Sequence, residues 1–478
     1  MNDHLTWGGF ARFALCAFTF FVSGCAVDQK TEVATARKWI DGGKPGDARI
    51  EPGAVVSLTD ALRLANQNEE RLSIQGETYL QALIAKDRGF AAFQPTANVG
   101  ASYSLSSQTT AFFGPTSHNF SAPASGQINL FNGFRDYHNL KAVDFTIEQQ
   151  KQLVLDLQQT VLLEVIQTYY QVLTSEQSVE VFTNSIQVQQ ARVRNIQAQA
   201  RVGTARPLDV AQAQAQLSQT QVSLNQSRAD VSNGRATLAF LIDAPIQENP
   251  LRDDYDPPTD SHPLDQWELT AEDGRQDLKA AQASVNAARQ QVEIAFGQYY
   301  PTLSANLNYS LYTDPLGGAG LWNGLLNLNL PIFTGGVIHA NVRTAWSQFR
   351  QQSLTQRQLK RSIDETVEQA YTNLDLAHRQ LAELQIEVRA ARDALYLADQ
   401  TYKAGRGILL DVLTAQNTLL TTQLQLTTEE FNQKTAYLNM LRTVGKLNLT
   451  IAQSTTRPSQ QALRELATQP ATAPSPQP

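Results

Sequence analysis

Two segments of the chain alternate strictly between apolar and polar residues. In residues 97–105 apolar side chains form one face and Asn, Ser or Gly the other, and residues 303–311 repeat this pattern. Shorter alternating segments follow at 127–130 and 326–330, each after a loop rich in Gly, Pro or Ser. Alternation with a period of two is typical of β-strands, so the sequence predicts two β-hairpins. The predicted hairpins cover about 95–133 and 301–333.

The segments between these hairpins have a helical pattern. Residues 140–201 contain neither Pro nor Gly, and as one helix they would be about 90 Å long, too long for a compact domain. Heptad spacing of mostly apolar residues follows in both halves of the chain and predicts coiled-coil packing. Residues 203–207 and 405–407 interrupt the two helical patterns with the Gly and Pro expected between consecutive helices. The heptad positions are Val210, Leu217, Leu224, Val231 and Leu238, then Val412, Leu419, Leu426, Gln433 and Met440.

The chain contains two copies of one repeat. Thr96 and Thr302 each follow a proline and lie 206 residues apart, whereas Gly203 and Gly405 lie 202 apart. The change of four residues falls inside the hairpins, where a loop can absorb it. A segment rich in Pro and Asp separates the copies and is the predicted linker. The C-terminal tail is expected to be disordered. The predicted bounds are 52–243 for the first repeat, 244–263 for the linker, 264–450 for the second repeat and 451–478 for the tail.

The first residues resemble a lipoprotein signal peptide. Residues 13–22 are apolar, too few to span a bilayer, and are followed by Ser23, Gly24 and Cys25. Cleavage of residues 1–24 would leave Cys25 to carry a covalent lipid, such as palmitate, at the start of an N-terminal segment, 25–51. Ordinary secretion with an incidental cysteine is the alternative. Because one lipid is only a partial anchor, we expect a second attachment to the membrane.

Composition and motifs argue against several other classes of protein. The net charge of -7 disfavours nucleic-acid binding, and two cysteines cannot form a disulfide framework or a Cys-rich metal site. The sequence has no nucleophile elbow, phosphate loop or dinucleotide fingerprint, and its six histidines lack metal-ligand spacing. We therefore expect no enzymatic activity, no metal and no cofactor other than the covalent lipid on Cys25.

Four strands with one apolar and one polar face suit the wall of a membrane barrel. Four strands cannot close a barrel, and an open edge is not tolerated in lipid, so the chain has to oligomerise. A trimer would supply twelve strands around a polar, uncharged lumen. The alternative is a soluble α+β domain in which helices cover the apolar face.

The repeated motifs together make the chain similar to the outer-membrane efflux protein family of TolC-like ducts, and within it to lipoproteins of drug-efflux systems. These motifs are the Pro-Thr strand starts, the Phe-x-Gly strand ends and the two Gly-x(5)-Asp-Val-x-x-Ala-Gln turns. The resemblance implies a mainly α-helical fold with β-structure: an internally duplicated α-helical coiled-coil barrel and a trimeric, twelve-stranded transmembrane β-barrel. It places the protein in the bacterial outer membrane, lipid-anchored and extending into the periplasm. It also implies passive export of small molecules, with a periplasmic adaptor and an inner-membrane pump as partners.

The same resemblance points to the two helical tips, about 203–209 and 405–411. Asp209, Tyr402 and Asp411 are candidate gate residues, and a hydrogen bond from the Tyr402 hydroxyl to Asp209 would be charge-assisted. Arg406 is a further candidate, since it lies beside the position of the family's gate arginine. The alternative for both aspartates is helix-start chemistry, in which a carboxylate favours the positive end of the helix dipole. The candidate turn and adaptor-contact residues are Gly203, Pro207, Gly405 and Gly407.

Two other functions remain open from the sequence. One is a lipid-tethered periplasmic coiled coil that forms no pore. The other is a duct of the same family that serves type I protein secretion or metal efflux.

Overall fold

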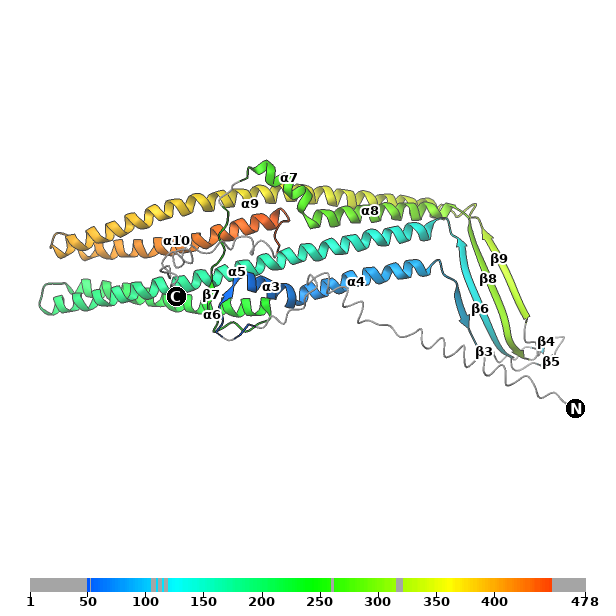
Figure 1. The fold of residues 1–478 in the computed structure, drawn as a ribbon, viewed down its shortest axis with the longest axis horizontal. Coiled ribbons are helices and arrows are strands. Elements are labelled where there is room, and N and C mark those ends of the chain that lie inside the picture. Colours follow the sequence, from blue (N-terminus) through cyan, green and yellow to red (C-terminus); the bar gives the residue numbers. More distant parts are fainter. Residues whose placement is uncertain are drawn as a thin grey trace, which may run out of the picture.

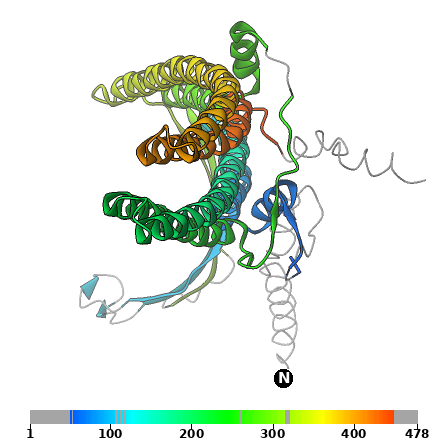
Figure 2. The same cartoon turned by 90° about the vertical axis from the view of Figure 1, so that its left-hand side faces the viewer.

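The computed structural model describes residues 50–51, 53–104, 109–110, 114–115, 119–258, 262–314 and 321–448. The predicted signal peptide, the lipidation site at Cys25 and the C-terminal tail lie outside these residues. The chain is elongated, with the strands at one end and two helix–helix turns at the other (Figure 1). Seen from the end with these turns, the helices form an arc that is open on one side (Figure 2).

Each repeat contains two short helices, a β-segment, one very long helix and a returning helix. In the first repeat these helices are α3 (Leu58–Asn68), α4 (Glu70–Ala91), α5 (Arg135–Arg201) and α6 (Pro207–Ile242). In the second they are α7 (Leu264–Gly274), α8 (Gln276–Phe296), α9 (Val337–Lys403) and α10 (Leu409–Thr443), with the 3-10 helix η1 (Gly297–Tyr299) after α8. Helix α5 has 67 residues, which confirms the long helix predicted from the absence of Pro and Gly in residues 140–201, and α9 has the same length.

The long helices connect the two ends of the molecule. Helices α4 and α8 pack beside the parts of α5 and α9 that lead to the strands, and α6 and α10 pack beside the parts that lead to the turns (Figure 1). Each repeat therefore ends in an antiparallel helical hairpin, α5–α6 or α9–α10, which we call the first and second tip hairpins.

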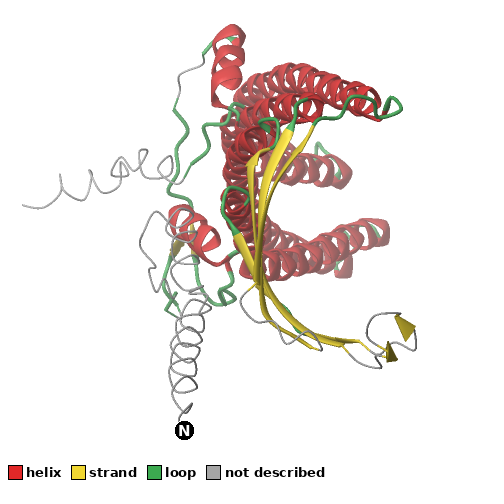
Figure 3. Ribbon diagram, turned by 90° about the vertical axis from the view of Figure 1, so that its right-hand side faces the viewer, coloured by secondary structure: helices red, strands yellow, loops and turns green. Residues whose placement is uncertain are grey.

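The strands form one curved antiparallel sheet (Figure 3). Its order is β2–β6–β8–β9, and β3 pairs with β6 beyond the end of β2. Within the described residues, the outer strands β2, β3 and β9 pair on one side only. A separate two-stranded sheet joins β4 and β5. The bounds are β2 Thr96–Val99, β3 Ser102–Ser104, β4 Thr109–Thr110, β5 Gly114–Pro115, β6 Asn119–Phe131, β8 Thr302–Asp314 and β9 Leu321–Asn329.

The first strand of the first hairpin differs from the prediction of one continuous strand. It is divided into β2 and β3 at Gly100 and Ala101. Pro123 on β6 lies opposite this break, where its carbonyl accepts a hydrogen bond from the Gly100 N–H at 3.0 Å. Proline has no N–H to donate to the ladder, and the pairing of β6 with β8 also shifts register between Ala122 and Pro123. The missing donor therefore interrupts the ladder toward β2 and β3, and the register shift toward β8 occurs at the same place.

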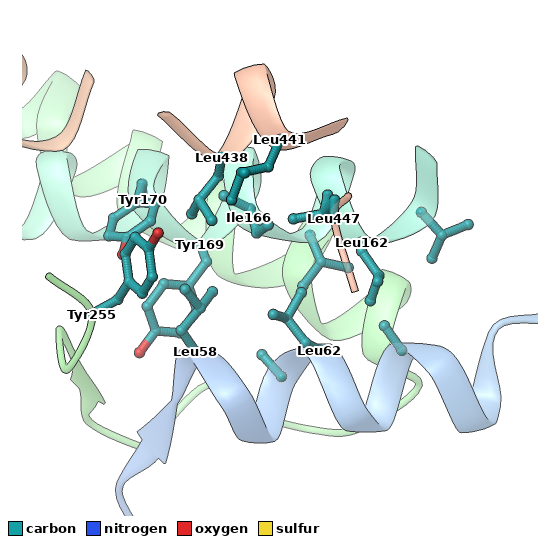
Figure 4. Close-up of a cluster of buried hydrophobic side chains, with 14 of the residues drawn as sticks. Leu58, Leu62, Leu162, Ile166, Tyr169, Tyr170, Tyr255, Leu438, Leu441 and Leu447 are labelled. Atoms are coloured by element: carbon teal, nitrogen blue, oxygen red, sulfur yellow. The ribbon is translucent and has the colours of Figure 1, made fainter. Parts of the chain in front are cut away.

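The elements that form the largest hydrophobic core lie about halfway along the long helices (Figure 1), and Figure 4 shows this core in close-up. There β1 (Val56–Ser57) pairs in parallel with β7 (Leu251–Arg252), which belongs to the segment between the repeats. Tyr169 of α5 is fully buried beneath this pair, and its hydroxyl lies 2.9 Å from the Val56 carbonyl and 2.8 Å from the Arg252 carbonyl. It also accepts the Arg252 N–H at 3.1 Å. One buried hydroxyl thus fixes the segment between the repeats to the long helix.

Candidate functional site at the helical tips

The two tip turns have the same backbone structure. After α5, the Gly203 N–H bonds to the Ala200 carbonyl at 3.1 Å and the Thr204 N–H to the Gln199 carbonyl at 2.9 Å. After α9, the Gly405 N–H bonds to Tyr402 at 2.9 Å and the Arg406 N–H to Thr401 at 3.0 Å. This pair of bonds is the Schellman motif, which requires a left-handed residue after the helix. Gly203 and Gly405 supply it, with φ of 79° and 71°.

The helices that follow the turns begin differently in the two repeats. Pro207 is the first residue of α6, where its missing N–H costs nothing because the first N–H groups of a helix have no partner within it. Leu409 takes the corresponding place in α10. Gly407 lies against the end of α9, where an added Cβ would come within 3.1 Å of the Tyr402 nitrogen. Pro207, Gly203 and Gly405 are exposed, so they are accessible at the end of the molecule.

Asp209 caps the start of α6. Its carboxylate accepts the Arg206 N–H at 3.1 Å and forms an ion pair with the Arg206 guanidinium at 2.8 Å. These bonds, the guanidinium bond above all, hold the pKa of the Asp209 carboxyl below its ordinary value. Although its partner is exposed, Asp209 itself is buried. The helix-start interpretation therefore accounts for its contacts within the chain.

Asp411 has the equivalent place in α10 but different surroundings. Ile408 stands where the first repeat has Arg206, so the second turn has no guanidinium at that position. Asp411 is exposed, and within the described residues its carboxylate has no hydrogen bond or ion pair. Arg406 is also exposed, and its backbone N–H forms the turn. The two carboxylates are thus equivalent in sequence only.

The predicted hydrogen bond between Tyr402 and Asp209 is wrong for the single chain. The Tyr402 hydroxyl donates instead to the side-chain carbonyl of Gln199 on α5, at 3.3 Å. The Asp209 oxygens already accept the N–H and guanidinium groups of Arg206, so the carboxylate is turned toward its own helix start. Burial raises the pKa of Tyr402, and the negative charge of Asp209 raises it further. Tyr402 still joins the two tip hairpins, but its partner is the side-chain amide of Gln199 and not a carboxylate.

An ion pair that the sequence did not predict joins the same two hairpins. Arg192 of α5 lies 3.6 Å from the carboxylate of Asp399 on α9, which also pairs with Lys403 at 2.6 Å. The Arg192 side chain is mostly buried, and its Nε is buried without a hydrogen-bond partner. Burial accordingly lowers the pKa of Arg192, although Asp399 opposes that effect.

These contacts line a cleft of about 470 Å³ between the first and second tip hairpins. Arg192 and Gln199 come from α5, whereas Asp399, Tyr402 and Lys403 come from α9. Between the returning helices, the Gln216 side-chain amide of α6 donates to Asn417 of α10 at 3.2 Å. A small apolar cluster of Val193, Ile196, Ala213, Leu409 and Leu413 packs beside the cleft. The arrangement can hold two helical hairpins together through polar contacts that are open to rearrangement.

A comparison of the two repeats contains the signal that points to Arg192 and Asp399. The position equivalent to Arg192 is Ala394, and the position equivalent to Asp399 is Gln197. Each repeat therefore has a charge near its tip that the other lacks, and the charges are opposite. These residues belong to no repeated motif, because each of them is replaced by an uncharged residue at the equivalent position of the other repeat.

Among the described residues, no group of three or more His, Cys, Asp or Glu side chains could hold a metal ion. None of the helices described is long and apolar enough to cross a membrane.

Comparisons with known proteins match most of the chain. The outer membrane efflux protein family matches residues 87–243 and 270–446. The outer membrane efflux protein BepC of Brucella suis is 26% identical over 67% of this chain and 71% of its own. The pyoverdine export outer membrane protein OpmQ of Pseudomonas aeruginosa is 26% identical over 63% of this chain, which spans 64% of that relative's length. The solved structure of VceC from Vibrio cholerae has the same fold, with a TM-score of 0.71, 17% identity and coverage of 81% of this chain and 96% of its own.

Proposed function

The chain belongs to the outer membrane efflux protein family, and from that premise we propose that it is the outer-membrane channel of a tripartite efflux system. In this proposal it is a passive duct that exports small molecules, and it is not an enzyme. A periplasmic adaptor and an inner-membrane pump are its partners, and the pump supplies the energy.

The observation that carries this proposal is the sheet of β2, β3, β6, β8 and β9. On β8 the apolar face consists of Leu303, Ala305, Leu307, Tyr309 and Leu311, and the opposite face consists of Ser and Asn. Several apolar residues on β9 are more than half exposed, including Trp322, Leu326 and Leu328. Within the described residues no helix covers them, which distinguishes the sheet from that of a soluble α+β domain. A bilayer is the environment in which such a face is stable.

Closure of the sheet requires further copies of the chain. The four strand positions of one chain end in β2 and β3 on one side and β9 on the other, each paired on one side only within the described residues. Because an open edge is not tolerated in lipid, each edge has to meet the edge of another copy. We propose three copies and a twelve-stranded barrel, with the helical arcs continuing the same wall as a tunnel through the periplasm.

The tip hairpins form the proposed gate of this tunnel. The contacts that join them, Arg192 with Asp399 and Tyr402 with Gln199, would hold the end closed until an adaptor docks. Asp209, Asp411 and Arg406 remain candidate gate residues, because a second copy can supply contacts that one chain lacks. The exposed turn residues Gly203, Pro207 and Gly405, together with Gly407, are the proposed adaptor contacts.

A lipid on Cys25 would add a second membrane attachment to that of the barrel. The proposed location is the bacterial outer membrane, with the helices extending into the periplasm. No cofactor besides this lipid is needed, because the duct only provides a path.

Membrane extraction tests this function against the lipid-tethered rod. Membranes that contain the Cys25→Ser variant are washed with alkaline carbonate, and the pellet is then solubilised with detergent and its mass is measured. We expect the unlipidated variant to stay in the pellet and to have the mass of a trimer in detergent. Release of the variant by carbonate alone would contradict the barrel and favour the rod.

A further inference from the structure

The cleft between the two tip hairpins carries more positive than negative charge. The charged residues that line it are Arg192, Arg392, Lys403 and Asp399. Three cations therefore share the cleft with a single carboxylate, and that carboxylate already lies 2.6 Å from Lys403 on its own helix. A cleft with this excess of positive charge is complementary to an anion.

Arg192 has the least complete set of partners among these cations. Its side chain is only 16% exposed, its contact with Asp399 is 3.6 Å long, and its Nε is buried without a hydrogen-bond partner. A buried guanidinium is stable only where its charge and its N–H groups are paired. Because its planar donors match the oxygens of an oxyanion, an anion in the cleft would supply the contacts that Asp399 supplies only in part.

Arg392 brings a second guanidinium to the cleft from the other hairpin. It is exposed, and in the part of the chain that the structure describes it forms no ion pair. The bond between Tyr402 and Gln199 places these two residues at the same level of α9 and α5, which both run toward the tips (Figure 1). Seven residues earlier, Arg192 is level with Leu395. Arg392 lies three residues before that level, about 4.5 Å along the helix axis, which a long side chain can span.

Apolar side chains lie beside both arginines. Val188 is one turn before Arg192 on α5, and Tyr396 is one turn after Arg392 on α9, and residues four apart share a helix face. Val188 and Tyr396 also line the cleft, and they are 52% and 64% exposed. The cleft volume of about 470 Å³ lies within the usual range of small-molecule sites, about 300–1,000 Å³. It therefore has room for an apolar body as well as for an anionic group.

The two arginines come from different repeats, and neither of them is repeated. The position equivalent to Arg192 is Ala394, and the position equivalent to Arg392 is Gln190. Both equivalents are uncharged. The duplication therefore does not account for this pair of guanidinium groups, which meet only where the two tip hairpins lie side by side.

We propose that the cleft binds a small organic anion, whose charged group lies between Arg192 and Arg392 and whose apolar body packs against Val188 and Tyr396. Such a ligand contacts both tip hairpins, so it binds best when they are together. By linkage it stabilises the arrangement that it binds best. This consequence rests on the proposed function: in a channel whose gate is formed by the tip hairpins, the ligand keeps the gate closed.

Isothermal titration calorimetry of the purified full chain in detergent tests the site. The probe is 2-naphthalenesulfonate, which combines a permanently ionised sulfonate with an apolar ring. We expect saturable binding of one probe per chain. The uncharged 2-naphthalenesulfonamide controls for partition of the ring into detergent, and inorganic sulfate controls for charge alone. Both should bind more weakly by about tenfold or more, because each lacks one of the two kinds of contact.

Variants of single arginines show whether the probe occupies the cleft. Arg192→Gln and Arg392→Gln should each weaken binding by about tenfold or more, because each removes a charged donor to the sulfonate. Arg389→Gln is the matched control and should bind as the wild type does. Arg389 is an exposed arginine of the same helix that does not line the cleft, and its Nε donates to the Gln385 carbonyl. Helical circular dichroism checks that all three variants are folded.

Three results would overturn the proposal. The first is the absence of saturable binding, or equal binding by the wild type, Arg192→Gln and Arg392→Gln. The second is equal binding of the sulfonate and the sulfonamide, which would mean that the charge is not recognised. The third is binding of inorganic sulfate as tight as that of 2-naphthalenesulfonate, which would refute the apolar part of the ligand.

Single-channel recording in planar bilayers tests the effect on the gate separately. The probe should lower the fraction of time for which wild-type channels are open several-fold, and it should have a smaller effect on Arg392→Gln. An unchanged open fraction at a probe concentration that saturates the site would refute the link to the gate. If the wild type does not conduct even without the probe, the proposed function fails, whereas the calorimetric result for the cleft does not depend on conductance.

Discussion

At the scale of single residues, the two repeats give equivalent carboxylates different tasks. Asp209 is buried and bonded to Arg206, whereas Asp411 is exposed beside Ile408. The sequence predicted both as helix-start or gate residues because the spacing after Gly203 and Gly405 is the same. The residue three positions earlier does differ, Arg206 against Ile408, but only the side-chain conformation shows that Arg206 binds Asp209. The same conformation makes the predicted bond from Tyr402 to Asp209 wrong for the single chain, because the carboxylate is turned toward Arg206.

Asp209→Asn should lower the stability of the first tip hairpin by about 1 kcal/mol, because the amide cannot form the ion pair with Arg206 and lacks the charge that the start of α6 favours. Because the folded pKa of Asp209 is lowered, its contribution is present above its unfolded pKa of about 3.9 and is lost as the pH falls through the folded value. Urea unfolding followed by helical circular dichroism at pH 7 and pH 3 measures both effects.

Asp411→Asn is the matched control for this prediction. Its carboxylate has no bond within the described residues, so only the helix-dipole contribution, about 0.3–1 kcal/mol at most, should be lost. Equal losses in the two variants at pH 7 would contradict the assignment of Asp209 as the bonded cap.

At the scale of elements, the strands and helices can be predicted from the period of the hydrophobic pattern and from the Gly and Pro residues that separate elements. The long helix of the first repeat, the two β-hairpins and the interruptions at both tips lie where alternation, the absence of Pro and Gly, and the glycines predict them. The break between β2 and β3 was missed because its cause, Pro123, lies on the opposite strand and acts across the sheet. The contact of β7 with Tyr169 was missed for a similar reason, since a segment rich in Pro and Asp shows no pattern that places it in a core. Local patterns predict elements, and long-range pairing modifies them.

Gly405→Ala should destabilise the second tip hairpin by about 1–2 kcal/mol, because alanine in the left-handed conformation brings its Cβ close to the following carbonyl. The turn is exposed, so the cost is backbone strain alone, since an added Cβ would meet no atom within 4 Å. Gly100→Ala is the control, with open space and no positive φ. Helical circular dichroism in urea compares the two variants, and similar midpoints would refute the strain argument.

Tyr169→Phe should destabilise the middle of the molecule by about 1–3 kcal/mol. The change leaves the Arg252 N–H without its acceptor, and the Val56 and Arg252 carbonyl groups without the hydroxyl proton that they share. Tyr170→Phe is the matched control, because it removes one long bond, 3.4 Å to Asp253, from the neighbouring residue of the same helix. Thermal unfolding of the purified protein compares them. A smaller shift for Tyr169→Phe than for Tyr170→Phe would contradict the role of Tyr169 in fixing β7.

At the scale of the whole molecule, one chain has the shape of a segment of a curved wall. The helices form an open arc, and the sheet curves with both outer strands paired on one side only within the described residues (Figures 2 and 3). The apolar face of the sheet and the polar tip contacts lie at opposite ends of the same long helices. This separation fits a duct that is inserted at one end and regulated at the other. The four predicted strands, too few to close a barrel, led to the prediction of several copies, but the contacts between the tip hairpins required the structure.

The most direct test of this account is the planar-bilayer conductance of the purified wild-type protein beside Asp399→Asn. That variant removes the ion pair between the tip hairpins. Asp375→Asn is the control, because Asp375 pairs with Arg379 within α9 and joins no hairpins. We predict discrete but small wild-type conductance, a several-fold increase in Asp399→Asn and no change in Asp375→Asn. Equal conductance in all three would contradict closure by the Arg192–Asp399 contact, and no conductance from any correctly assembled sample would contradict the duct itself.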